Sequence, residues 1–172
     1  MYTRNLAVIA GLVLSLHAGA QTDDRGYLVQ VGQKIPAGIV LQLTNDTRVH
    51  LDSLRGKVVL LQFTASWCGV CRKEMPYLEK DVWQAYRDKG LLLYGVDRDE
   101  PVEVVKKFAK DIKVSYPLAL DPGAEIFARF AHKNAGVTRN VLIDREGKII
   151  FLTRLFDEKE FAALLSILAK QF

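Results

Sequence analysis

The chain has 172 residues, of which 49% are hydrophobic and 26% are charged, with 12 glycines and 5 prolines. This composition is typical of a globular chain of one-domain length, and it excludes collagen-like, low-complexity and largely disordered proteins. The formal net charge is +4 and the basic residues form no dense stripe, so we expect no nucleic-acid binding. Two cysteines are too few for a disulfide scaffold.

The first 20 residues have the pattern of a secretory signal. Arg4 precedes an apolar run from Leu6 to Leu16, and an Ala-Gly-Ala sequence follows at 18–20. The run is shorter than the roughly 18–20 residues that span a bilayer, so we expect cleavage after Ala20 rather than an uncut anchor. The sequence therefore predicts a signal peptide at 1–20 and a domain at 21–172 without a membrane span. This domain would lie in the periplasm or otherwise outside the cytoplasm, where disulfides persist.

The rest of the chain alternates between β-prone runs and helical patterns. In chain order we expect a hairpin of strands at 39–43 and 48–51, a buried strand at 58–63, a helix at 71–89, a buried strand at 91–96, a helix from about 99 to 113, an extended piece at 116–120, a short helix at 124–132, a second hairpin of strands at 140–143 and 148–152, and a last helix at 158–170. This order predicts an α/β fold in which helices cover both faces of one mixed sheet, with the first hairpin as an N-terminal β-hairpin extension.

Local signals mark where the predicted helices bend, begin and end. Pro76 inside the first helix predicts a kink, and Gly90 is a helix-end signal. Asp99 is expected to cap the next helix, and we interpret the charged run at 97–100 as a solvated loop after a strand.

Both cysteines lie in the sequence Trp67-Cys68-Gly69-Val70-Cys71, between the strand at 58–63 and the helix at 71–89. Free N–H groups and the helix dipole favour an anion at this place, so a thiolate at Cys68 would be stabilised and its pKa lowered. The thiolate is the attacking species in disulfide exchange, and Cys71 lies one turn further along the chain. We therefore expect Cys68 to attack a substrate disulfide and Cys71 to resolve the mixed disulfide.

Other hypotheses for the cysteine pair remain open. Zinc would need two further ligands, and His17, His50 and His132 have no ligand-like spacing. A purely structural disulfide across so short a loop would add little stability. A thiol peroxidase would carry Thr or Ser three residues before the cysteine, where Ala65 stands. A redox-inactive binding or chaperone module would keep the cysteines incidentally. We favour the redox pair and expect it to need no bound cofactor.

The stretch from Phe63 to Leu78 (FTASWCGVCRKEMPYL) resembles the active-site segment of TlpA/ResA-type thiol–disulfide oxidoreductases in the thioredoxin superfamily. The runs at 54–61 and 141–148 are also similar to this family, so the likeness covers about residues 31–170. The resemblance implies a thioredoxin-like fold and the reduction of disulfides in exported proteins, including apocytochrome c in some members. It also implies a membrane thiol transporter as the electron donor. No dimerisation segment is visible, so we expect a monomer.

Glu74 is the candidate for proton transfer. It follows Cys71 by three residues, so both lie on one side of the predicted helix. The resemblance implies such a role for this acid, and a half-buried carboxylate with a raised pKa could move the proton of a buried thiol. Gln62 stands where thioredoxins proper carry a buried acid, which leaves Glu74 as the better candidate. The alternative is a solvated helix charge beside Arg72 and Lys73.

The family also has a cis-proline loop opposite the cysteines, and here Thr138 occupies the proline position, followed by Arg139. A cis bond before a residue other than proline costs about 2.5–4 kcal/mol, so this bond is either trans or held by strain. Because the family's loop binds the substrate chain, we expect substrate-binding roles for Thr138 and Arg139, with ordinary turn residues as the alternative. We expect Trp67 to form an apolar lid beside the pair, with simple packing as the alternative.

Overall fold

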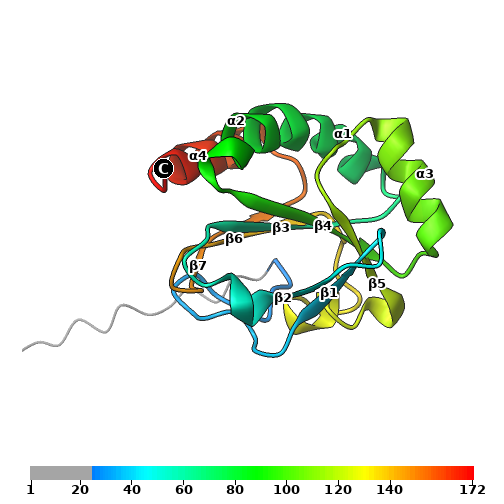
Figure 1. The fold of residues 1–172 in the computed structure, drawn as a ribbon, viewed down its shortest axis with the longest axis horizontal. Helices are drawn as coiled ribbons and strands as arrows, with labels where there is room; N and C mark the ends of the chain where they lie inside the picture. Colours follow the sequence, from blue (N-terminus) through cyan, green and yellow to red (C-terminus); the bar gives the residue numbers. More distant parts are fainter. Residues whose placement is uncertain (1–24) are drawn as a thin grey trace, which may run out of the picture.

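The computed structural model describes residues 25–172, so the predicted signal peptide lies outside the described residues. Within this part of the chain, one seven-stranded sheet has the strand order β2-β1-β5-β4-β3-β6-β7 (Figure 1). Its strands are β1 (Val40–Leu43), β2 (Arg48–His50), β3 (Val59–Thr64), β4 (Leu92–Arg98), β5 (Leu118–Asp121), β6 (Arg139–Ile143) and β7 (Ile149–Arg154).

The sheet is mixed, as predicted. Strand β4 runs parallel to both β3 and β5, which makes the centre of the sheet parallel. The pairs β3–β6 and β6–β7 are antiparallel on one side, and β1 pairs antiparallel with β5 and β2 on the other. Each residue of β3 is buried, as expected for a strand covered on both faces.

The predicted helix at 71–89 is a continuous helical run whose geometry changes after Pro76. It consists of α1 (Gly69–Tyr77), a π-helical segment η2 (Leu78–Trp83), α2 (Gln84–Tyr86) and a 3-10 turn η3 (Arg87–Lys89). Proline lacks the N–H that an α-helix needs at this position, and the π geometry begins two residues later, at Leu78. The run ends at Gly90, whose left-handed backbone (φ 96°) matches the predicted end signal.

Two predictions about helix boundaries are wrong. The helix α3 (Val102–Ile112) has Pro101 as its N-cap, and Asp99 lies outside it with φ 63°. The carboxylate of Asp99 instead accepts the N–H of Gly123, which joins two loops. The short helix expected at 124–132 is replaced by the 3-10 turns η4 (Pro122–Ala124) and η5 (Phe127–Arg129).

Different elements cover the two faces of the sheet. Figure 1 shows α1, α2 and α4 (Glu158–Ala169) over one face, and side chains from α1, α3 and α4 form one core cluster with the sheet. The other face packs against the turn η5, the 3-10 turn η1 (Leu51–Leu54) and the segment that precedes β1. Between residues 25 and 172, no helix is long and apolar enough to cross a membrane.

Candidate active site

The cysteine pair lies where β3 ends and α1 begins. Cys68 is the N-cap of α1, and its Sγ accepts the backbone N–H of Cys71 at 3.2 Å. Its carbonyl oxygen accepts the N–H of Arg72, the first hydrogen bond of the helix. The sulfur therefore takes the place that a hydroxyl or carboxylate oxygen takes at an ordinary N-cap, facing the free amide groups of the first turn.

The two sulfurs differ in their access to solvent. Cys68 and Cys71 form a disulfide, with their Cα atoms 5.3 Å apart. Cys68 is 8% exposed, whereas Cys71 is fully buried. An incoming disulfide can therefore approach Cys68 more readily than Cys71, and the order of attack stays a prediction.

Thr138 lies against both sulfurs. Its Oγ1 is 3.1 Å from the Sγ of Cys68 and 3.1 Å from the Sγ of Cys71. The hydroxyl can donate to one sulfur at a time, so it can stabilise whichever sulfur carries negative charge. Residues 25–172 contain no cis peptide bond, so the bond before Thr138 is trans. The carbonyl of Thr138 accepts the N–H of Leu155 at 3.0 Å, which fixes the loop at Thr138 against the chain that follows β7.

Arg139 and Trp67 differ in burial, since Arg139 is fully buried and Trp67 lies on the surface. The guanidinium of Arg139 lies 4.4 Å from the centroid of the Tyr27 ring and donates to the carbonyls of Gly136 and Arg25. Trp67 is 64% exposed. The substrate-binding roles of Arg139 and Trp67 stay predictions, and the observed position of Trp67 makes it an apolar surface beside the cysteines rather than a packed side chain.

Glu74 is buried beneath the pair, with 1% of its surface exposed. Its Oε1 accepts a hydrogen bond from Asn140 Nδ2 at 2.6 Å, and its Oε2 accepts one from Gln62 Nε2 at 3.2 Å. Burial raises the pKa of Glu74 to about 7, and this effect outweighs the two hydrogen bonds, which lower the pKa. The carboxyl group is therefore poised to exchange a proton near neutral pH.

The two amides that hold Glu74 are register partners. Gln62 on β3 pairs with Asn140 on β6, which places both side chains over the same face of the sheet. Each amide has a further partner: the hydroxyl of Tyr116 donates to Gln62 Oε1 at 2.7 Å, and Asn140 Nδ2 donates to Thr153 Oγ1 at 2.9 Å. Of these side chains, we connected only Gln62 with the site from the sequence, and we missed Asn140, Tyr116 and Thr153. The available signal was Asn140, a polar residue directly before the apolar run at 141–143 of β6.

The charged run at 97–100 is not the solvated loop that we predicted. Asp97 belongs to β4 and is fully buried, and the carboxylate of Glu100 accepts both the N–H of Ser66 at 2.5 Å and its hydroxyl at 2.6 Å. Ser66 is also held through its carbonyl, which accepts from Arg72 Nε at 2.7 Å. Hydrogen bonds to Glu100 and to Arg72 thus hold the turn that leads to Cys68.

Asp97 is a second buried acid near this turn. Burial is the main cause that raises its pKa to about 8, and the negative charges of Glu100 and Asp121 raise it further. Asp97 pairs with Thr64, the last residue of β3, in the parallel ladder. Among the described residues, no group of three or more His, Cys, Asp or Glu side chains is arranged to hold a metal ion.

Comparisons with known proteins show the family of this chain. The family model described as Redoxin matches residues 30–168. Thiol-disulfide oxidoreductase ResA from a strain of Bacillus cereus is 32% identical over 146 residues, covering 84% of this chain and 81% of the relative. ResA from Geobacillus thermodenitrificans is 30% identical over 145 residues, covering 84% of this chain and 79% of the relative.

Solved structures give the same result. A candidate protein disulfide isomerase from Bacteroides thetaiotaomicron is 58% identical with a TM-score of 0.82, covering 85% of this chain and 92% of the other. A candidate thiol:disulfide interchange protein DsbE from Chlorobium tepidum is 28% identical with a TM-score of 0.72, covering 84% and 99% of the two chains. These matches confirm the family resemblance and the thioredoxin-like fold that the sequence predicted.

Proposed function

Since the chain belongs to the Redoxin family and is a thiol–disulfide oxidoreductase of the ResA and DsbE type, we propose that it reduces disulfides in exported proteins outside the cytoplasm. The observation that carries this proposal is the position of Cys68, whose sulfur caps α1 and accepts the N–H of Cys71. This position stabilises a thiolate, which is the species that attacks a disulfide.

In the first step, the Cys68 thiolate of the reduced protein attacks one sulfur of the client disulfide. A bond forms between Cys68 and that sulfur, the client S–S bond breaks, and the other client sulfur leaves as a thiolate and takes a proton. The hydroxyl of Thr138, 3.1 Å from Sγ, donates a hydrogen bond to the Cys68 thiolate before the attack. Trp67 contributes to the surface that the client chain covers, whereas Arg139 is fully buried and would act by holding the loop at Thr138 through its hydrogen bond to the carbonyl of Gly136.

In the second step, Cys71 resolves the mixed disulfide. Glu74 in its carboxylate form takes the proton of the buried Cys71 thiol, and the resulting thiolate attacks the Sγ of Cys68. The bond between Cys68 and the client sulfur breaks, and the second client thiolate leaves. Two electrons have then passed from the cysteine pair to the client, and the Cys68–Cys71 disulfide is the product that the structure contains. A membrane thiol transporter would reduce this disulfide again by the same kind of exchange.

We further propose that residues 1–20 are a cleaved signal peptide and that residues 21–172 act as a monomer. The support for export is the sequence pattern of a basic start, an apolar run and an Ala-Gly-Ala end. The client protein would belong to the exported disulfide-containing proteins, and maturation of cytochrome c is one process that uses such a reductase.

The test is insulin reduction with dithiothreitol, together with the equilibrium potential of the pair against glutathione. The parent protein should accelerate insulin reduction, and Cys68→Ser should not. A strongly reducing potential is expected for a reductase, whereas a value near the roughly −120 mV of the strongest disulfide donors would refute the proposed direction. Hydrogen peroxide should be turned over slowly, because Ala65 stands three residues before Cys68, where a thiol peroxidase carries Thr or Ser, and the hydroxyl of the neighbouring Thr64 lies against Met75 Sδ at 3.3 Å.

A further inference from the structure

A pocket lies at the opposite end of β3 and β6 from the cysteine pair. Its volume is about 240 Å³. Val59, the first residue of β3, and Ile143, the last residue of β6, both line it, whereas Cys68 and Thr138 lie beyond the other ends of these strands. At about 3.3 Å per residue, β3 alone separates the two places by roughly 20 Å. The pocket therefore does not belong to the redox site.

The floor of the pocket is apolar. It is formed by Ile35 from the segment before β1, by Leu51 and Leu54 from η1, and by the two strand residues Val59 and Ile143. A ligand that covers this floor must bring an apolar body, because a polar one would lose its hydration there without gaining partners. The volume lies below the 300–1,000 Å³ of pockets for drug-sized molecules, so the body must be short.

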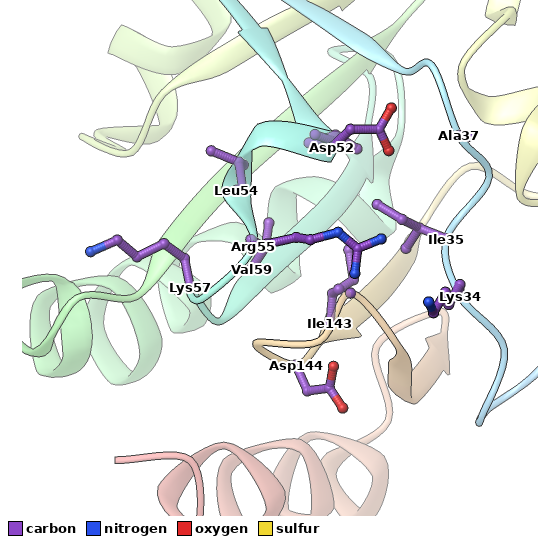
Figure 2. Close-up of a pocket in the computed structure, with 12 residues that line it drawn as sticks. Lys34, Ile35, Ala37, Asp52, Leu54, Arg55, Lys57, Val59, Ile143 and Asp144 are labelled. Atoms are coloured by element: carbon purple, nitrogen blue, oxygen red, sulfur yellow. The ribbon is translucent and has the colours of Figure 1, made fainter.

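The rim of the pocket carries a cation with free donors. Figure 2 shows the side chain of Arg55 extended across the pocket toward Ile35. Arg55 Nη1 donates to the carbonyl of Glu146 at 2.8 Å, and no carboxylate within residues 25–172 forms an ion pair with the guanidinium. Four of its five N–H groups are therefore available, in the planar arrangement that matches a carboxylate.

The other charges at the rim leave Arg55 unneutralised. Asp52 accepts the N–H of Gly38 at 2.8 Å, and Asp144 accepts two backbone N–H groups of its own turn. In Figure 2 both carboxylates are turned away from the guanidinium of Arg55. Lys34 and Lys57 also line the pocket, and neither has an ion-pair partner in the described part of the chain. The lining thus has one positive charge more than it has negative charges.

We propose that this pocket binds a small monocarboxylate with a short apolar chain. The carboxylate would form paired hydrogen bonds with Arg55, and the chain would cover the floor of Ile35, Leu51, Leu54, Val59 and Ile143. A bare inorganic anion would leave this floor in water, and an uncharged apolar molecule would leave the cation without a partner. The apolar floor and the free guanidinium together select a ligand that has both parts.

The probe is hexanoate, titrated into the oxidised full chain and followed by amide chemical shifts. Saturable shifts are expected at Leu54 and Gly147, while acetate and 1-hexanol, which each lack one part of the ligand, should bind at least tenfold more weakly. Arg55→Ala should weaken hexanoate binding at least tenfold, and Arg55→Lys should bind with intermediate affinity, because a lysine keeps the charge but not the paired donors. Arg48→Ala is the matched control, since Arg48 contacts Gln42 on the β1–β2 hairpin and should leave binding unchanged.

Insulin reduction by Arg55→Ala at the rate of the parent protein would show that this variant is folded, because Arg55 is remote from the cysteines. The proposal is overturned if hexanoate shifts do not saturate, if 1-hexanol binds as tightly as hexanoate, or if folded Arg55→Ala binds hexanoate like the parent. A peptide with a C-terminal leucine that binds more tightly than hexanoate would also overturn it, because the site would then recognise a chain end rather than a small molecule.

Discussion

The buried carboxyl group of Glu74 makes the stability of the oxidised protein depend on pH in a way that Glu74→Gln removes. Its pKa is raised from 4.5 to about 7, so the folded state holds this proton more tightly than the unfolded state. Between these pH values the parent therefore loses stability as the pH rises, by about 3 kcal/mol in total. Glutamine resembles the protonated acid and cannot ionise, so Glu74→Gln lacks this loss.

The assay is urea unfolding of the oxidised parent and of Glu74→Gln from pH 4 to pH 8.5. All other titrating groups are common to both proteins, so the difference between their unfolding free energies isolates Glu74. That difference should move by about 3 kcal/mol in favour of Glu74→Gln between pH 4.5 and pH 7.5. Glu103→Gln, which removes an exposed carboxylate from α3, should show no such change. A difference between parent and Glu74→Gln that stays constant to within about 0.5 kcal/mol across this range would refute the reasoning.

Three further results are expected. Glu74→Gln should slow the resolution of a mixed disulfide by about a hundredfold at pH 7 in single-turnover experiments, because the Cys71 thiol loses its proton acceptor; an unchanged rate would return Glu74 to a structural role. Thr138→Ala should slow iodoacetamide labelling of reduced Cys68 near neutral pH by about tenfold, because the thiolate loses a hydrogen-bond donor, whereas Thr138→Ser should behave like the parent. Asp97→Asn should be more stable than the parent above pH 8, since the raised pKa of Asp97 means that folding is disfavoured once this buried acid ionises; equal pH profiles in thermal unfolding would contradict this.

The features that were predictable from the sequence depend on local patterns. The near-continuous apolar run of β3 and the apolar spacing of the helix that follows it need no knowledge of distant residues. The same holds for the cysteine pair, because two sulfurs that follow a buried strand and begin a helix fall at the helix N-terminus in any fold of this kind. The position of Cys68 as N-cap of α1 is the result of this local order.

The features that the sequence did not predict depend on tertiary contacts. Asp97 and Glu100 stand in a run of charges that is typical of a solvent-exposed loop. In the structure Asp97 belongs to β4, and Glu100 accepts two hydrogen bonds from Ser66. The helix expected at 124–132 cannot begin where we predicted it, because Gly123 and Ala124 both have positive φ, which no α-helix accommodates. Phe127 instead begins the 3-10 turn η5 and Phe130 follows its end, and the ring centroids of both lie 5.4 Å from that of Phe63.

Gln62 and Asn140 both donate hydrogen bonds to Glu74, so the acid–base chemistry of this residue depends on strand pairing. These two amides face the carboxyl group only because β3 and β6 meet in one register. A slip of a single residue would turn one of the amides to the opposite face of the sheet and leave the buried acid with half of its donors. Proton transfer by Glu74 therefore depends on the alignment of β3 and β6. A sequence change far from the cysteines that disturbs this alignment would affect catalysis without altering any contact of the sulfurs.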